Sequence, residues 1–387
     1  MESSGQAVAG RLMSLDGLRA VAILAVVAFH FSRVTVIPDV YPSTSAIEPL
    51  TVFGRYGVHL FFVISGFVVF LTLERCRSRA EFLLRRFARL WPALIAATLL
   101  GMVVVALLAP GTALQTPPSG LAASMTTIDP YVWHRLGWAS VEWIDGSLWS
   151  LWVEVSFYVI AALVYFAKPG KFLRNLTIVA GAMLVLRVVL VIAASGGSQG
   201  AYDVFMMFGL LHFVWFFVFG AAMWNVYRSY DVRSSIRIAI IAIAAQALTS
   251  SVHDPRAAAE VSPLVNGLVV LVIAAIFCAA LYVPWFSRVL CVRPLVRIGN
   301  ASYSIYLIHQ TLGLALVYAI ITVTGIESPA SYLAVAVSVM VMFACGFALQ
   351  HFIESPVQRF LLARLVRPRT LLPVASPVTP SPDRIST

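Results

Sequence analysis

The chain is poor in charge and almost lacks lysine. Only 11% of its 387 residues are Asp, Glu, Lys or Arg, whereas 60% are hydrophobic. An ordinary soluble domain carries roughly 25% charged residues. Lysine occurs only at Lys168 and Lys171. This composition excludes a soluble globular protein and indicates an integral membrane protein.

Cysteines are few and isolated. The chain has four, at Cys76, Cys278, Cys291 and Cys345, with no CxxC pair and no partner at metal-ligand spacing. We therefore expect no disulfide framework and no zinc or iron–sulfur site.

Long apolar stretches predict the fold class. Ten runs of about 20 residues predict membrane-spanning helices. They cover residues 17–37, 57–73, 90–110, 150–167, 175–194, 205–224, 235–252, 264–283, 301–323 and 332–353. No Ala-x-Ala-like site follows the first run, so we expect a retained anchor rather than a signal peptide. The prediction is an all-α integral membrane protein of about ten transmembrane helices.

The basic residues follow the positive-inside rule. With the N-terminus in the cytoplasm, twenty Lys and Arg residues fall in cytoplasmic segments, and Arg33, Arg55, Arg135 and Arg256 fall in outer linkers. Both termini are then cytoplasmic. The net charge of +10 is explained by membrane topology, so nucleic-acid binding is not expected.

Three segments follow from this topology. We expect a cytoplasmic segment over residues 1–14, a polytopic membrane domain over 15–360, and a disordered cytoplasmic tail over 361–387 that is first basic and then rich in Pro and Ser. The longest outer linker, residues 111–149, contains several Trp residues. It either covers the outer mouth of a site or anchors the chain at the membrane interface.

Arg19 and His30 stand out in the first apolar run, because a charge inside a membrane helix costs about 2.5–3.5 kcal/mol. They are eleven residues apart, about 20° beyond three full turns, and roughly 16 Å apart along the axis. They therefore share one helix face and mark the two ends of one slot. Alternatively, Arg19 snorkels to the cytoplasmic surface and His30 bonds a neighbouring helix.

Two more ionisable residues interrupt later runs. Glu154 lies within SLWSLWVEVSFYV at nearly the depth of His30, so a contact between these two residues is expected. An interfacial Glu that faces water is the alternative. Arg187 lies in LVLRVVL. It is expected to pair with Glu154 or with another buried acceptor, and it is given no chemical role.

Polar groups cluster at two further places. RRFARLWP places Arg85, Arg86 and Arg89 beside the start of the third predicted helix, where they either grip phosphates or only set the topology. In NASYSIYLIHQ, His309 shares a helix face with Ser302 and Tyr306, which predicts a polar stripe pointing into the bundle.

In order, five motifs resemble membrane acyltransferase family 3, the group of bacterial O-antigen, exopolysaccharide and Nod-factor O-acetylases and macrolide O-acyltransferases. LDGLRAVAILAVVAFHF resembles its R-x10-H opening, GVHLFFVISGF its G-V-x-L-F-F-V-L-S-G-F segment, and RRFARLWP its R-x-x-R loop. GSLWSLWVEVSFYV resembles its S-L-W-S-L-x-V-E block and IGNASYSIYLIHQ its S-Y-S-L-Y-L-x-H block. The matches extend over about residues 12–360.

There are two departures from the family pattern. Position 59 is His where the family has Asp or an uncharged residue, and Val155 stands where a second Glu often follows. We expect no periplasmic esterase-like domain after the last predicted helix, and in this respect the sequence resembles the stand-alone members.

The resemblance implies a multi-pass enzyme of the bacterial cytoplasmic membrane with acyl-coenzyme A, most simply acetyl-coenzyme A, as donor and no metal. It implies that Arg19, His30 and Glu154 are catalytic. Donor binding would fall to Arg86, Arg89, Arg85 and Ser65, and Tyr306 and His309 would line the site.

The expected mechanism is direct transfer, in which neutral His30, oriented by Glu154, deprotonates the acceptor hydroxyl as it attacks the thioester. A transient acyl-histidine is the variant. The acceptor is either a cell-surface polysaccharide or lipid-linked sugar, or a macrolide or other secondary metabolite.

A secondary transporter or lipid-carrier flippase also buries charges near the membrane midplane. A transporter or flippase, however, does not need an Arg cluster that binds coenzyme A. A non-catalytic scaffold gives no reason for buried Glu154 and His30.

Overall fold

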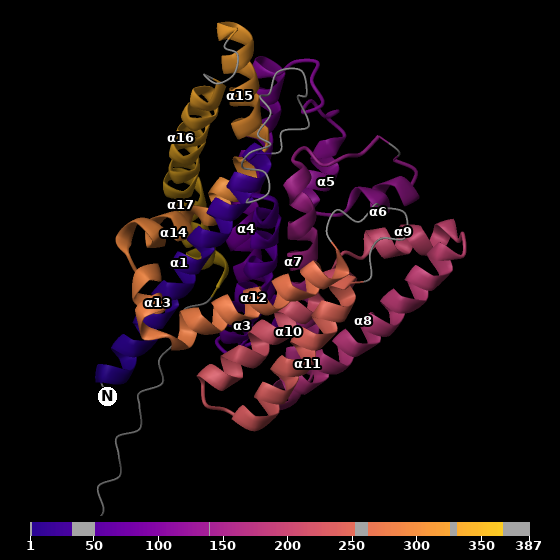
Figure 1. Cartoon of the computed structure of the whole chain (residues 1–387), viewed down its shortest axis with the longest axis vertical. Helices are drawn as coiled ribbons and strands as arrows, with labels where there is room; N and C mark the ends of the chain where they lie inside the picture. Colours follow the sequence, from indigo (N-terminus) through magenta and orange to yellow (C-terminus); the bar gives the residue numbers. More distant parts are fainter. Residues whose placement is uncertain (1, 33–50, 139, 252–261, 326–330, 367–387) are drawn as a thin grey trace, which may run out of the picture.

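The protein is a bundle of helices (Figure 1). The computed structural model describes residues 2–32, 51–138, 140–251, 262–325 and 331–366, and it has no strand in these ranges. Nine helices in this part of the chain are long and apolar enough to cross a membrane. A tenth span is formed if α14 (Arg293–Ile308) and α15 (Thr311–Thr324) count as one bent span. The predicted all-α membrane fold is confirmed.

The other spans follow the predicted order. They are α1 (Glu2–Ser32), η1 (Val52–Tyr56) with α3 (Gly57–Leu73), α4 (Arg79–Leu108), η2 (Gly146–Leu148) with α7 (Trp149–Ala167), η3 (Pro169–Lys171) with α8 (Phe172–Ser195), α9 (Gln199–Met207) with α10 (Leu210–Tyr227), α11 (Val232–Ser251), α12 (Pro263–Tyr282), and α16 (Ser331–Leu349) with the π-helix η4 (Gln350–Glu354) and α17 (Ser355–Leu365). The short helices α5 (Gly120–Thr126), α6 (Pro130–Arg135) and α13 (Pro284–Leu290) lie in linkers.

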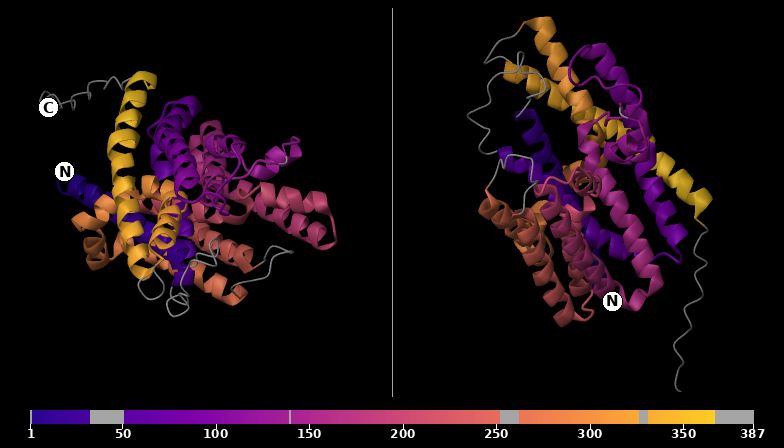
Figure 2. Two further views of the ribbon diagram at one scale, coloured as in Figure 1. Left: turned by 90° about the horizontal axis from the view of Figure 1, so that it is seen from above. Right: turned by 90° about the vertical axis from the view of Figure 1, so that its right-hand side faces the viewer.

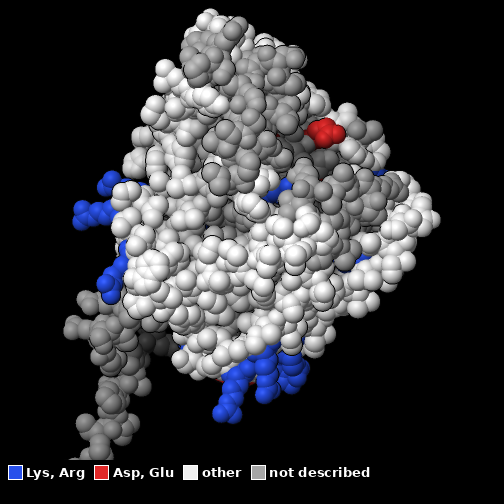
Figure 3. Space-filling view, viewed as in Figure 1, with Lys and Arg blue, Asp and Glu red and all other residues white. Residues whose placement is uncertain are grey.

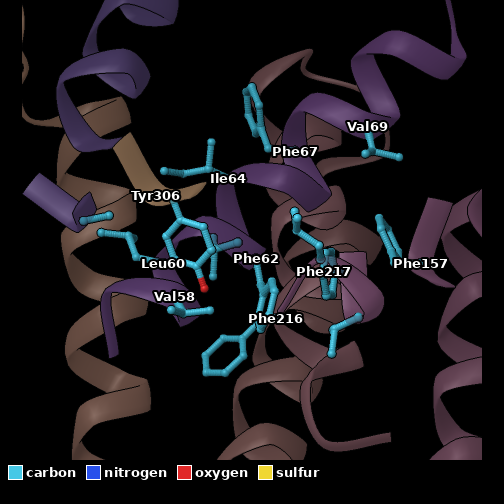
Figure 4. Close-up of a cluster of buried hydrophobic side chains, with 14 of the residues drawn as sticks. Val58, Leu60, Phe62, Ile64, Phe67, Val69, Phe157, Phe216, Phe217 and Tyr306 are labelled. Carbon is cyan, nitrogen blue, oxygen red and sulfur yellow. The ribbon is translucent and has the colours of Figure 1, made fainter. Parts of the chain in front are cut away.

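Helices α3 and α10 form the centre of the bundle. The α3 span is 78% buried and the α8 span only 22% buried, so α3 is enclosed by protein whereas α8 is open to the surroundings. The backbones of α3 and α10 approach closely, because a Cβ at Gly66 would lie 2.2 Å from the carbonyl oxygen of Phe217. Small residues permit such contacts in membranes. Phe62, Phe217 and Phe157 fill the space around them (Figure 4).

Helix α1 packs against α14 in the same manner. A Cβ at Gly299 would overlap the carbonyl oxygen of Asp16, so the two backbones are in contact. The C-terminal helices, yellow in Figure 2, lie along one side of the bundle. Helix α1 also packs against α3, α3 against α7, α7 against α4, and α4 against α14, so these five helices surround a common interior.

Two predicted spans need correction. The run 301–323 is not one helix, because α14 and α15 meet at an angle of 67°. The third span begins at Arg79, eleven residues before the predicted start at 90. Ser78 caps it by accepting a hydrogen bond from the Glu81 N–H at 3.2 Å. Arg85, Arg86 and Arg89 are thus part of α4 rather than residues beside it.

Charge is distributed unevenly over the surface. Lys and Arg project mainly from the lower and left margins of the molecule in Figure 3, whereas the small acidic group visible in this view lies in the upper half. We call the end that carries the α7–α8 and α10–α11 linkers, with Lys168, Lys171, Arg228 and Arg233, the basic end. Its cytoplasmic orientation stays a prediction. Helix α1 begins at Glu2 and α17 ends at Leu365, while residues 367–387 of the predicted tail lie outside the described residues.

Substituting Gly66 with Ala tests the contact between α3 and α10. We expect a loss of about 1–3 kcal/mol in stability, because the new methyl group collides with backbone rather than with a flexible side chain. The matched control is Gly181→Ala in α8, where nothing lies within 4 Å of the added Cβ and Ala is the better helix former by about 1 kcal/mol. Thermal unfolding in detergent compares the two. Equal midpoints for both variants would contradict the close approach.

Candidate functional site

A polar cavity lies between α1, α3, α4, α7 and α14. Its charged and hydroxyl-bearing lining residues are Arg19, Ser65, Arg86, Arg89, Ser150, Glu154, Tyr158, Ser302, Tyr303 and Tyr306. Apolar side chains such as Phe61 and Leu151 complete the wall. Three guanidinium groups and one carboxylate line this space, so it favours an anionic ligand.

Helix α4 supplies two of the guanidinium groups. Arg86 and Arg89 are three residues apart and share one face. The Arg86 side chain is buried, and its Nη2 donates to Oγ1 of Thr72 at 2.5 Å. Its guanidinium carbon lies 5.0 Å from the centre of the Tyr158 ring, a cation–π contact that offsets part of the cost of burial.

Arg85 lies on a different face of α4. Its side chain is 37% exposed and bonds Oε1 of Glu81 at 2.8 Å. It is not among the residues that line the cavity. The structure thus brings Arg86 and Arg89 to the site but leaves Arg85, which the sequence grouped with them, outside it.

The third guanidinium group comes from α1. Arg19 lines the cavity, and its Nη1 bonds Oδ1 of Asp16 at 2.6 Å. The pair is i,i+3 on one helix, so Asp16 holds the arginine from the side of the basic end.

Glu154 has two hydroxyl partners. It accepts hydrogen bonds from Oγ of Ser65 at 2.8 Å and from Oη of Tyr158 at 2.5 Å. Ser65 is therefore a partner of the carboxylate as well as a lining residue. The predicted contact between Glu154 and His30 is wrong. The guanidinium of Arg187 lies over the ring of Phe205, 5.5 Å from the centroid, and Arg187 is not among the residues that line the cavity with Glu154.

His30 lies against His309 rather than in the cavity. Nδ1 of His30 is 3.2 Å from Nε2 of His309 and 3.0 Å from the carbonyl oxygen of Val26. Nδ1 of His309 is 2.5 Å from the carbonyl oxygen of Tyr306. His30 is not among the residues that line this cavity, so the predicted single slot from Arg19 to His30 stays a prediction.

These contacts assign the protons of the neutral imidazoles. A carbonyl only accepts, so Nδ1 of His309 carries a proton and its Nε2 is an acceptor. Nδ1 of His30 faces two acceptors, Val26 O and His309 Nε2, and it therefore carries a proton too. Nε2 of His30 is left with a lone pair, as a general base requires.

Tyr306 joins the cavity to the histidine pair. Its phenol donates to the carbonyl oxygen of Ser147 at 2.9 Å, and Oγ of Ser150 is 2.8 Å from the phenol oxygen. Its ring lines the cavity beside Val58 and Leu60 of α3 (Figure 4), while its carbonyl holds His309. The predicted polar stripe of Ser302, Tyr306 and His309 does point into the bundle, since all three are buried.

Sequence reasoning missed several residues of the site. Tyr158 follows Glu154 by four residues, and this helical spacing in the sequence could have predicted their contact. Glu354 is buried in the π-helix η4, where it accepts from Oγ of Ser304 at 2.6 Å and acts electrostatically on Arg89. Asp145 was assigned to an outer linker but is buried, and burial raises the pKa of its carboxyl. In the described part of the chain no group of three His, Cys, Asp or Glu residues is placed to hold a metal ion.

Comparison with known proteins identifies the class to which this fold and site belong. The family model Acyl_transf_3, described as an acyltransferase domain, matches residues 13–360. The chain therefore belongs to the Acyl_transf_3 family of acyltransferase domains. The match includes every residue of the cavity and both histidines.

Individual relatives are more distant. The chain is 24% identical over 324 residues to an O-acetyltransferase OatA of Staphylococcus aureus, an alignment that covers 78% of this chain and 50% of that protein. It is 26% identical over 377 residues to the peptidoglycan O-acetyltransferase OatA of Listeria monocytogenes, covering 89% of this chain and 56% of that protein. It is 29% identical over 156 residues to the acyltransferase MdmB of Streptomyces mycarofaciens, covering 40% and 39%.

The chain spans about half the length of the two OatA proteins. No solved structure matches it.

The proton assignment is directly testable. Nitrogen NMR of the full chain in detergent, labelled at histidine, is expected to show both His30 and His309 as the Nδ1–H tautomer near neutral pH. The signals are assigned by the loss of one resonance in His30→Gln and in His309→Gln. An Nε2–H tautomer at His30 would contradict its assignment as the base.

Proposed function

We propose that the chain is a membrane-embedded O-acyltransferase that moves an acyl group, most simply acetyl, from acyl-coenzyme A to a hydroxyl of a carbohydrate-containing acceptor. The observation that carries the proposal is the pairing of His30 with His309 outside a cavity lined by arginines. This pairing leaves Nε2 of His30 with a lone pair that can accept a proton. Family membership supports acyl transfer.

The donor's phosphates suit the arginine cavity. Arg86 and Arg89 lie seven and ten residues from the start of α4 at the basic end, about 10–15 Å into the bundle. Arg19 lies roughly 16 Å along α1 from His30, a distance comparable to a pantetheine arm. Phosphates held by the arginines thus allow the thioester to lie near the histidine pair. Guanidinium groups are well suited to phosphate because their donors are oriented and their charge is permanent.

The reaction follows from the tautomers. Nε2 of His30 takes the proton of the acceptor hydroxyl while the oxygen attacks the thioester carbonyl carbon. The C–S bond then breaks, the ester forms, and the coenzyme thiolate recovers the proton from Nε2. His309 Nε2 accepts from Nδ1–H of His30 throughout, so it orients the base and stabilises its protonated form. Glu154 is not the partner of His30. Its carboxylate instead balances the charge of the arginines.

Acyl-histidine formation uses the same lone pair. In this variant Nε2 of His30 itself attacks the thioester, and the acceptor hydroxyl then attacks the acyl-imidazole. Mass spectrometry of the His30 peptide after rapid acid quench separates the two routes, because only this variant leaves an acyl group on the peptide.

A carbohydrate hydroxyl is the first choice of acceptor. Two relatives are O-acetyltransferases, one of them named for peptidoglycan, and the histidine pair lies away from the basic end. The similarity to the acyltransferase of Streptomyces mycarofaciens supports a secondary-metabolite hydroxyl as the second candidate. Comparing glycans and metabolites of cells that express the wild-type chain or His30→Ala identifies the acceptor by the mass gain of one acyl group.

Substituting His30 with Ala is expected to lower transfer by about 100-fold or more, because it removes the general base, while the chain still folds. Coenzyme A release from acetyl-coenzyme A in membrane vesicles measures the rate, and size-exclusion chromatography in detergent checks the fold. Undiminished release from folded His30→Ala would refute the proposed chemistry. Movement of a substrate without coenzyme A release would favour a transporter.

The double substitution Arg86→Gln with Arg89→Gln is expected to weaken coenzyme A binding by about 10-fold or more, because two charge-assisted contacts to phosphate are lost. Arg85→Gln is the matched control, since Arg85 lies on the same helix outside the cavity. Isothermal titration with coenzyme A gives the dissociation constants. If all variants bind coenzyme A equally, the arginines do not hold the donor.

A further inference from the structure

A three-residue segment contacts the chain on both sides of His309. Asp145, Gly146 and Ser147 directly precede α7, and the side chains of Asp145 and Ser147 are 4% and 2% exposed. These residues do not line the arginine cavity, and no step of the proposed mechanism uses them as reactants. They come from the end of the long linker, for which the sequence left two roles open, a cover for the site or an anchor at the membrane interface.

Asp145 holds the residues after His309. Its Oδ2 accepts from the backbone N–H of Thr311, the first residue of α15, at 3.2 Å. A carboxylate at this position satisfies an N–H that has no partner within the helix and interacts favourably with the helix dipole. Its Oδ1 accepts from the N–H of Ser147 at 2.9 Å and from Oγ of Ser147 at 2.5 Å, so the carboxylate itself is fixed.

Ser147 and Gly146 hold the residues nearest His309. The carbonyl oxygen of Ser147 accepts from the phenol of Tyr306 at 2.9 Å, three residues before His309. A Cβ at Gly146 would lie 3.3 Å from the Gln310 side-chain oxygen, so the segment passes directly beside the residue that follows His309. Three consecutive residues therefore contact positions 306, 310 and 311.

We infer that Asp145 is a positioning residue for acyl transfer, which fixes the break between α14 and α15 so that Nε2 of His309 faces Nδ1 of His30. The inference rests on the proposed function. The break bends the span by 67°, and nothing in the α-helical pattern itself fixes the direction of a side chain at such a bend. A small rotation there lengthens the 3.2 Å contact between the two imidazoles and leaves Nδ1 of His30 with the Val26 carbonyl as its other partner.

The charge of Asp145, like its hydrogen bonds, favours the action of His30 as a base. Among the described groups, Asp145 is the carboxylate that acts electrostatically on His30. When His30 takes up the proton of the acceptor, a fixed negative charge nearby stabilises the imidazolium. Asp145 thus takes the role that the sequence had assigned to Glu154.

Asp145→Asn tests the inference because it keeps the size of the side chain, removes its charge and replaces one acceptor oxygen by an amide NH2 group, so the side chain no longer accepts from both Thr311 and Ser147. We expect kcat for coenzyme A release from acetyl-coenzyme A to fall by about 10- to 100-fold, less than on loss of the base itself, with KM for acetyl-coenzyme A within about threefold. The matched control is Asp129→Asn. Asp129 is also a buried capping aspartate, which accepts from the N–H of Tyr131 at 2.9 Å, but it has no contact with the bend. The kcat of Asp129→Asn is expected to stay within about twofold of the wild-type value.

A double-mutant cycle separates positioning from general stability. If Asp145 acts through His309, the two residues act as one unit. The kcat of the double variant Asp145→Asn with His309→Ala is then less than about threefold below that of His309→Ala alone. Full multiplication of the two losses in folded protein would show that Asp145 acts on His30 through its charge alone, and it would overturn the inferred positioning through His309. An unchanged kcat for Asp145→Asn would also overturn it.

The outcomes for the proposed function are distinct. If His30→Ala keeps wild-type coenzyme A release, the proposed chemistry fails. If His30→Ala is inactive while Asp145→Asn matches Asp129→Asn, only the positioning role fails. Ser147→Ala provides a second variant in case Asp145→Asn does not fold. It removes one hydrogen bond to Asp145 and keeps the carbonyl contact to Tyr306, and its kcat is expected to fall by about three- to tenfold, with no fall contradicting the role.

Discussion

The hydrogen bond between Nε2 of His309 and Nδ1 of His30 joins residues 279 positions apart, and the arrangement of the site depends on it. A membrane interior demands paired backbone groups, so a helix break there is tolerated only where other parts of the protein supply partners. Here Asp145 accepts from the first N–H of α15, and the Tyr306 carbonyl accepts from His309 itself. These two hydrogen bonds stabilise the break, at which the imidazole of His309 contacts His30 of α1.

Separation of charge explains why the histidines lie outside the arginine cavity. A base that becomes an imidazolium is disfavoured by nearby cations, and three guanidinium groups line the cavity. Along α1 the rise between Arg19 and His30 is roughly 16 Å, and Tyr306 stands between the cavity and the pair. In the proposed reaction, the arginines thus attract an anionic donor without opposing protonation of His30. The carboxylate on the histidine side is Asp145, and the one in the cavity is Glu154.

The sequence predicted the spans, the family and most of the charged residues that line the site, because buried charges are conspicuous among apolar residues. It did not predict which groups meet. Helical spacing places Arg19 and His30 on one face, but it does not show which helix faces them. The predicted partner of His30 was therefore Glu154. In the structure Glu154 bonds Ser65 and Tyr158 instead. The break at His309 was missed because no Gly or Pro marks it within 301–310. Asp145 and Glu354 were missed because each lies at the edge of an apolar run, where a carboxylate normally faces water.

The charges behind the cavity wall determine how strongly the cavity attracts an anion. Its lining has three arginines and Glu154, but Asp16 bonds Arg19 and Glu354 acts on Arg89, so the larger cluster has three cations and three carboxylates. Such a cluster is stable without a ligand, because no large excess of charge is buried. The guanidinium groups are also oriented in advance, Arg19 by Asp16 and Arg86 by Thr72. Affinity for an anionic ligand such as the proposed donor then comes from oriented hydrogen-bond donors rather than from net charge. A site of this kind releases its product more readily than one that relies on three uncompensated cations, as an enzyme that must turn over requires.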